Sequence, residues 1–192
     1  MPKEKNLVLY RSDRLYLSPL SVDHAEYFLK WFNDPEIFGH LRDMSFQSNL
    51  EEQIRWVEAT NRDPSQKVFS LFYIPQDQLI GNGGFMHINW EDRKAEVGLA
   101  IGEKQFQGMG LGAEALWLLC KYGFEVMKLH NILGENYADN PIAISNARKI
   151  GLRYFGTRRQ SRRIGGKVLD VHYSDMLPHE LIKPEWKGPR CP

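Results

Sequence analysis

A glycine-rich segment between two apolar runs constrains the fold of this chain more than any other feature. Gly108, Gly110 and Gly112 follow a strand-like run at 95–101 and precede a helix-like run that starts at residue 113. N–H groups at a helix start attract anions, and a residue without a Cβ lets a phosphate approach them closely. The Lys-Ser/Thr pair of a Walker loop is missing, and the glycine spacing differs from the dinucleotide-binding fingerprint. The segment therefore predicts a strand, a pyrophosphate-binding turn and a helix.

Hydrophobic periodicity predicts a mixed sheet with helices on both faces, which is an α/β (α+β) fold. Strands are expected at residues 14–18, 68–74, 79–88, 95–101 and 132–138, and in a last hairpin, 152–176, that turns at Gly165-Gly166. Helices are expected from a cap at Ser21 to a stop at Pro35, and at 50–59 (opened by Ser48), 113–128 and 141–150. Because no repeat or linker divides the chain, we expect one domain over 1–192 with a core at about 14–177.

Composition limits the partners and the compartment that we expect. The 25 basic and 24 acidic residues nearly balance, which argues against nucleic acid and anionic membranes as partners. Two cysteines, Cys120 and Cys191, provide neither a disulfide framework nor a metal-ligand spacing. The first residues lack the apolar stretch of a signal peptide, and no run reaches the roughly 18 apolar residues of a membrane span. These features predict a cytoplasmic protein without a metal.

The pattern Gln107-x-x-Gly110-x-Gly112 resembles the acetyl-CoA pyrophosphate loop of the GNAT N-acetyltransferases. Asn33-Asp34-Pro35-Glu36 resembles a segment near the end of the first helix in the branch with ribosomal-protein N-terminal, polyamine and amino-sugar acetyltransferases. The resemblance extends over roughly 14–177. It implies a mostly antiparallel mixed sheet whose fourth and fifth strands, here 95–101 and 132–138, splay apart around the pantetheine arm of acetyl-CoA.

The resemblance also implies which residues bind the cofactor. The pyrophosphate would lie against the loop residues Gln107, Gly108, Met109, Gly110, Leu111 and Gly112. The backbone of Leu99, Ala100 and Ile101 would bond the pantetheine arm, and the same strand edge would support the thioester oxyanion. Asn140 would bond the pantetheine side, although a plain helix N-cap before Pro141 also explains this asparagine.

Glu96 and Tyr137 are the candidate catalytic residues. Direct transfer to an amine needs a base for the acceptor ammonium and an acid for the CoA thiolate. Glu96 matches a glutamate on the splayed strand of related enzymes, or it bonds backbone at a strand irregularity. Many relatives carry a tyrosine seven residues after the helix-initial asparagine, where this chain has Ala147. Tyr137 or a water would then be the acid, unless Tyr137 is only a half-buried strand aromatic.

Charged residues near the expected acceptor mouth bear on the substrate. One acidic group would attract a cationic amine: Asp34, Glu36, Asp43, Glu51 and Glu52. One basic group near the last hairpin turn would suit a nucleotide-sugar phosphate, ribosomal RNA or an acidic peptide: Arg158, Arg159, Arg162 and Arg163. Solvated helix faces and a charged edge that blocks sheet aggregation are the structural alternatives.

We therefore expect an acetyl-CoA-dependent N-acetyltransferase that moves the acetyl group directly to a primary amine of a small molecule or a protein N-terminus. A different acyl-CoA donor, a catalytically weak CoA-binding sensor or scaffold, and an RNA-associated module remain as alternatives. The departure at Ala147 favours the sensor, and the arginines favour the RNA-associated module. The expected partner is the amine-bearing acceptor, a homodimer stays open, and neither a membrane nor nucleic acid is expected.

Overall fold

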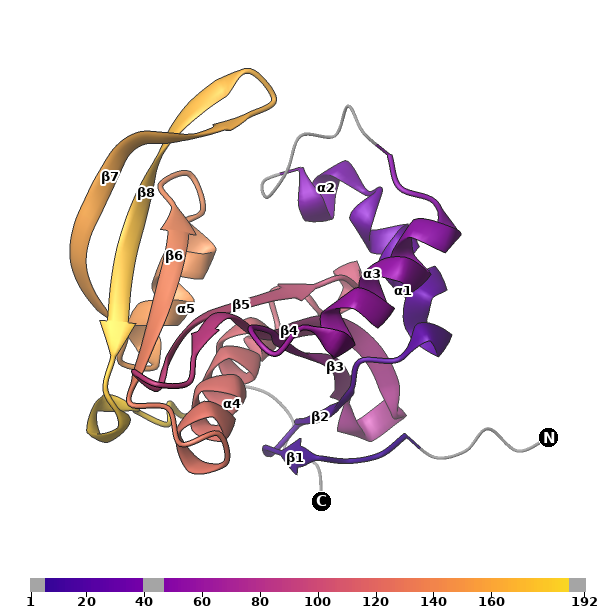
Figure 1. Cartoon of the computed structure of the whole chain (residues 1–192), viewed down its shortest axis with the longest axis horizontal. Helices are drawn as coiled ribbons and strands as arrows, with labels where there is room; N and C mark the ends of the chain where they lie inside the picture. Colours follow the sequence, from indigo (N-terminus) through magenta and orange to yellow (C-terminus); the bar gives the residue numbers. More distant parts are fainter. Residues whose placement is uncertain (1–5, 40–46, 187–192) are drawn as a thin grey trace.

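The structure is a computed structural model that describes residues 6–39 and 47–186 (Figure 1). Its strands are β1 (Tyr10–Arg11), β2 (Leu15–Pro19), β3 (Lys67–Tyr73), β4 (Gln78–Asn89), β5 (Lys94–Ile101), β6 (Asn131–Tyr137), β7 (Arg153–Ile164) and β8 (Lys167–Met176). Its α-helices are α1 (Ala25–Phe32), α2 (Pro35–Phe38), α3 (Leu50–Arg62), α4 (Leu111–Glu125) and α5 (Pro141–Lys149). All of the predicted strands and helices are present, and the short β1 and α2 were not predicted.

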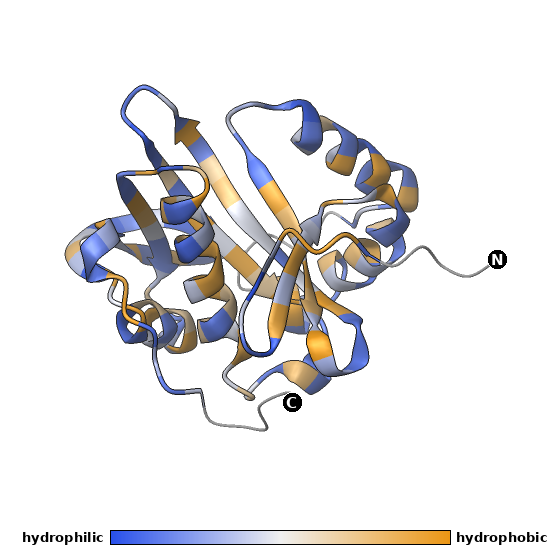
Figure 2. Cartoon of the chain, turned by 90° about the horizontal axis from the view of Figure 1, so that it is seen from below, coloured by the Kyte–Doolittle hydropathy of each residue, from blue (hydrophilic) through white to orange (hydrophobic). Residues whose placement is uncertain are grey.

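The strands form one sheet in the order β1-β2-β3-β4-β5-β6-β8-β7. Neighbouring strands run antiparallel except β5 and β6, which are parallel because α4 crosses over between them. The predicted fold class is therefore confirmed. Figure 2 shows hydrophobic colouring on the central strands and hydrophilic colouring on many outer loops. No helix in the described ranges is both long and apolar enough to cross a membrane.

Two hydrophobic clusters hold helices against opposite faces of the sheet. The larger cluster packs α4 and α5 on the central strands through fully buried residues such as Leu118 and Ile132. The smaller cluster packs α1 and α3 on β2 to β4 through residues such as Trp31 and Val57. Burial of apolar surface on both faces, at about 25 cal/mol per Å², fixes the sheet between two helical layers.

The parallel pair β5 and β6 separates part of the way along its length. Pairing runs from Lys94 opposite Asn131 to Val97 opposite Gly134 and goes no further. Residues 98–101 of β5 continue to pair with β4 on their other side. The predicted separation of these two strands therefore exists. They are the fifth and sixth strands of the structure, because the unpredicted β1 precedes them.

Three helix starts differ from the sequence prediction. Ser21 caps a short 3₁₀ turn at 22–24 in front of α1. Pro35 begins α2 as well as following α1, because its fixed φ suits a first helical position and the Asp34 side chain caps that turn. Asn49, rather than the serine before it, caps α3 through a reciprocal bond with the third helical residue. Local competition between neighbouring capping residues explains these shifts of one or a few positions.

Candidate active site

A cavity of about 820 Å³ occupies the place where β5 and β6 separate. Leu116, Ala143 and Asn146, from α4 and α5, line it on one side of the sheet. Phe28 and Trp56, from α1 and α3, line it on the other side. The cavity therefore passes through the sheet and joins its two faces.

The register of the splayed strands places three polar side chains on the α1–α3 side. Glu96 lies opposite Leu133 on β6, so both side chains point to the same face. Side chains alternate along a strand, so Glu135 and Tyr137 share that face with Leu133. All three polar residues line the cavity. The structure thus brings the two predicted catalytic residues together and adds Glu135, which the strand alternation from Tyr137 would have revealed.

The Glu96 carboxyl group is an unusually basic one for a glutamate. Burial raises the pKa of Glu96, the nearby Glu135 charge raises it further, and a hydrogen-bond contact with His87 opposes both effects. His87 Nδ1 lies 3.0 Å from Glu96 Oε2. The strand irregularity considered for Glu96 is on β4 instead, where the register shifts between Met86 and Asn89. That shift turns His87 against the carboxylate, so Glu96 contacts a side chain there.

Tyr137 keeps its proton at neutral pH. Burial raises the pKa of the Tyr137 phenol, and the positive charge of Arg162 opposes that shift. The Arg162 guanidinium carbon lies 5.7 Å from the centre of the Tyr137 ring. A protonated phenol in the cavity is a suitable proton donor, and it also fits the description of a half-buried strand aromatic.

The glycine loop has the backbone that its sequence predicts. Gly108 and Gly110 both have a φ of 75°, a conformation that residues with a Cβ rarely adopt. Gly110 is the N-cap of α4, which starts two residues earlier than predicted and so includes Gly112 in its first turn. A Cβ on Gly112 would lie 3.0 Å from Asn146 Nδ2, so this glycine also permits the close approach of α4 and α5.

The predicted cofactor residues divide into two sets. Leu99, Ala100, Gly112 and Asn140 line the cavity. The other set, Ile101, Gln107, Gly108, Met109, Gly110 and Leu111, does not line it. Gln107 Nε2 donates to the Ile101 carbonyl at 2.9 Å, which ties the loop to the end of β5 and uses the acceptor that Ile101 was predicted to offer.

Asn140 acts as the N-cap of α5. Its Oδ1 accepts a hydrogen bond from the Ala143 N–H at 3.0 Å, and Pro141 follows at the first helical position. The capping bond uses only the amide oxygen, and Asn140 also lines the cavity. The structure therefore contains the cap, and the amide nitrogen is the group that a contact with pantetheine would use.

Ala147 lies in the hydrophobic core, where 4% of its surface is exposed. It does not line the cavity, whereas Ala143 and Asn146 of the same helix do. A tyrosine introduced at this position would have to displace packed side chains before its hydroxyl reached the cavity. Ala147 therefore faces the core and not the cavity.

Four of the five acidic residues expected near the acceptor mouth lie in the described ranges, and of these only Glu52 lines the cavity. Asp34 and Glu36 pair with Lys104. Glu51 pairs with Arg55, and Asp43 lies outside the described residues. Five aromatic residues that the sequence did not single out form one wall of the cavity: Phe28, Trp31, Phe32, Phe38 and Trp56.

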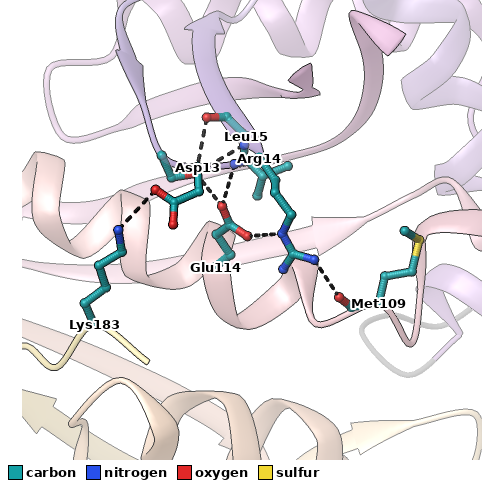
Figure 3. A network of polar contacts seen from close by, with 7 residues as sticks. Asp13, Arg14, Leu15, Met109, Glu114 and Lys183 are labelled. Carbon is teal, nitrogen blue, oxygen red and sulfur yellow. Dashed lines mark hydrogen bonds and ion pairs between the residues drawn. The ribbon is translucent and has the colours of Figure 1, made fainter. Parts of the chain in front are cut away.

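A buried ion pair lies under the glycine loop (Figure 3). Arg14 Nε donates to Glu114 Oε2 at 2.6 Å, and the two side chains are 1% and 0% exposed. Glu114 Oε1 also accepts from the Arg14 N–H and the Ser12 hydroxyl. Arg14 Nη1 donates to the Met109 carbonyl in the middle of the loop at 3.2 Å. The pair therefore links β2, the loop and the first turn of α4.

The described residues contain no group of three or more His, Cys, Asp or Glu side chains arranged to hold a metal ion.

Comparison with known proteins agrees with this architecture. The family model described as "Acetyltransferase (GNAT) domain" matches residues 14–153. The uncharacterized N-acetyltransferase p20 of Bacillus licheniformis is 25% identical over 171 residues, which cover 88% of this chain and 96% of that protein. The acetyltransferase PseH of Campylobacter jejuni is 26% identical over 126 residues, covering 65% and 74%.

Solved structures share the fold. Spermidine N-acetyltransferase from Vibrio cholerae, in complex with CoA and spermine, superposes with a TM-score of 0.80 at 22% identity, covering 88% of this chain and 98% of that one. A GNAT-family acetyltransferase from Bacillus anthracis gives 0.76 at 23% identity, covering 89% and 99%. Since the family model spans most of the sequence, the chain belongs to the GNAT acetyltransferase family.

Proposed function

We propose that this chain transfers an acetyl group from acetyl-CoA directly to a primary amine. One observation carries the proposal: the cavity crosses the sheet between β5 and β6 and has carboxylates on one face and the start of α4 on the other. Such a passage lets a donor approach from the loop side and an acceptor from the α1–α3 side.

Residues on the α4–α5 side suit a CoA thioester. The loop at 107–112 combines glycines at positive φ with the N–H groups of the first turn of α4, a combination that favours a pyrophosphate. Past Val97 the β5 edge has no β6 partner, so its backbone can bond the pantetheine arm. Asn140 stands at the same opening. Acetyl-CoA would supply an activated acyl group there.

Residues on the opposite side suit the proton transfers. Glu96 takes a proton from the acceptor ammonium, and the neutral amine nitrogen can then attack the thioester carbon. The free edge of β5 supports the negative oxygen that develops. Tyr137, which its raised pKa keeps protonated, donates its proton to the leaving thiolate, and the second proton lost by the acetylated nitrogen restores the phenol. Glu52 and Glu135 add negative charge that favours a cationic acceptor.

An assay of CoA release tests this function. Purified protein with acetyl-CoA and a panel of primary amines is expected to release CoA only when a suitable amine is present, with the acetylated amine identified by mass spectrometry. CoA binding without amine-dependent release from any member of a broad panel would instead favour the sensor or scaffold.

Gly110→Val is expected to weaken CoA binding by at least about tenfold, which corresponds to ~1.4 kcal/mol. A β-branched residue is strained at the Gly110 φ of 75°, so the loop backbone must move away from a phosphate. Some loss of stability should accompany this change for the same reason. Gly156→Val is the control, because an added Cβ there meets nothing within 4 Å. Calorimetric titration with CoA measures both, and unchanged affinity in folded Gly110→Val protein contradicts the pyrophosphate assignment.

Tyr137→Phe is expected to lower kcat by roughly tenfold or more without changing the affinity for CoA, because only the proton donor is lost. A water that takes over part of the transfer would limit the loss. Tyr173→Phe is a matched control, since Tyr173 faces the same side of the sheet but does not line the cavity. Steady-state rates with one confirmed amine decide the question, and full activity in Tyr137→Phe assigns the role to solvent.

A further inference from the structure

The sheet register places two arginines on the same face as the carboxylates of the cavity. Tyr137 lies opposite Val171 of β8, and Val171 lies opposite Arg158 of β7. Leu169, two residues from Val171, lies opposite Arg162. Residues that face one another across strands point to the same side of the sheet, so Arg158 and Arg162 stand on the side of Tyr137.

Arg162 lies at the rim of the cavity, and Arg158 lies on the same face of the sheet. The Arg162 guanidinium carbon is 5.7 Å from the ring centre of Tyr137, which itself lines the cavity. Arg158 and Arg162 are both exposed to solvent. The tip of the β7–β8 hairpin rises past the end of β6 and stands opposite α2 (Figure 1). An acceptor that reaches Glu96 from this side therefore passes close to them.

The charge of the site changes sign between interior and rim. Glu52, Glu96 and Glu135 line the cavity, and no lysine or arginine of the described ranges does. Arg158 and Arg162 supply positive charge outside it. A polycation would be attracted by the interior and repelled at the rim. A molecule with a cationic end and an anionic end would be attracted by both.

We infer that the acceptor is an amine that also carries an anionic group, a phosphate or a carboxylate, which Arg158 and Arg162 bind while the amine lies at Glu96. The inference rests on the proposed function. Guanidinium groups bind both anions through paired N–H donors that match two oxygens of either group.

Arg163 allows acceptor binding by Arg158 and Arg162 to be distinguished from a general effect of positive charge on this strand. It is adjacent to Arg162 but points to the other face of the sheet, where it lies opposite Val168. If the arginines only protect an edge strand against aggregation, the three residues should be interchangeable. If they bind the acceptor, Arg158 and Arg162 matter for binding and Arg163 does not.

Acceptor binding to the CoA-saturated protein, measured by calorimetry, tests the inference. The probes are two matched pairs: glucosamine 6-phosphate with glucosamine, and the dipeptide Gly-Glu with Gly-Gln. We expect the anionic member of one pair to bind at least about tenfold more tightly, since hydrogen bonds to charged groups are stronger than those between neutral groups. The preferred pair identifies the anion as phosphate or carboxylate. Added salt should reduce the preference.

The variants complete the test. Arg158→Gln with Arg162→Gln should abolish the preference for the anionic probe and leave the KM for acetyl-CoA unchanged, whereas Arg163→Gln should retain it. Equal binding of both members in both pairs, or a preference that survives the double substitution, overturns the inference. Amine-dependent CoA release in that case leaves the proposed function standing. Absence of release with any amine contradicts the proposed function, whichever probe binds.

Discussion

Glu96→Gln is expected to lower kcat near neutral pH by about a hundredfold, the usual scale for loss of a general base. The amide keeps the size of the side chain but cannot take a proton from the acceptor ammonium. The affinity for acetyl-CoA should change little, because Glu96 lies on the α1–α3 side of the cavity. Steady-state rates as a function of pH, with one confirmed amine, provide the measurement.

The rates of the parent protein and of Glu96→Gln should depend on pH in different ways. Glu96 acts as a base only when ionised, so the rate of the parent protein should fall as pH drops through its raised pKa. The variant lacks this limb, and its rate should recover toward high pH, where the acceptor is already neutral. Glu135→Gln is the matched control: without the Glu135 charge the pKa of Glu96 moves down, so the acidic limb should shift to lower pH.

The melting temperature of Glu96→Gln shows whether a loss of rate comes from lost catalysis or from a less stable fold. Burial is the main cause of the raised pKa of Glu96, so the folded protein disfavours the ionised carboxylate. A raised pKa contributes stability at low pH that is lost as pH rises through it. The neutral glutamine should therefore melt no lower than the parent at neutral pH. A full rate in Glu96→Gln would assign proton removal to water and leave Glu96 a structural role.

Glu114→Ala is expected to reduce the free energy of unfolding by about 3–5 kcal/mol, because it leaves the buried Arg14 charge without its carboxylate. For a chain of this length the loss corresponds to a fall in melting temperature of roughly 10 °C. The variant should also bind CoA less tightly, since Arg14 holds the Met109 carbonyl of the loop. Thermal and urea unfolding, followed by calorimetry with CoA, measure the two effects.

A double substitution, Arg14→Met with Glu114→Gln, distinguishes the effects. It removes both charges together, and the glutamine oxygen can still accept from the Ser12 hydroxyl and the main-chain N–H of residue 14. Stability should recover most of the way, because an unpaired buried charge no longer remains. CoA affinity should stay low, because the bond to Met109 is still missing. A Glu114→Ala protein as stable as the parent would show that the ion pair contributes no net stability.

Local patterns allowed much of the fold to be predicted. Strands and helices follow side-chain periodicity, and the loop follows glycines whose positive φ has few other solutions. The family pattern pointed to Glu96, and the departure from that pattern at Ala147 led to Tyr137; the structure places both residues on one cavity. These features depend on residues close together in the chain, or on a motif whose context was recognised.

The other features required the folded chain. Arg14 and Glu114 are 100 residues apart and meet only when β2 packs beside α4. His87 reaches Glu96 because of a register shift in β4, which the alternation of apolar and polar residues in the sequence does not predict. Ala147 occupies the position where many relatives carry a tyrosine, but the packing of α5 places it in the core. Tertiary packing decided each of these positions.

The separation of β5 from β6 has a mechanical consequence. The sheet consists of two leaves, β1 to β5 and β6 to β8, joined by only the register pairs from Lys94–Asn131 to Val97–Gly134. A molecule in the gap that bonds both strands replaces the hydrogen bonds that β5 and β6 do not make with each other there. Ligand occupancy and rigidity of the sheet are then linked, so saturation at 100 times the dissociation constant adds ~2.7 kcal/mol of stability. Slower amide hydrogen exchange should appear first on β6, the strand that borders the gap on the far leaf.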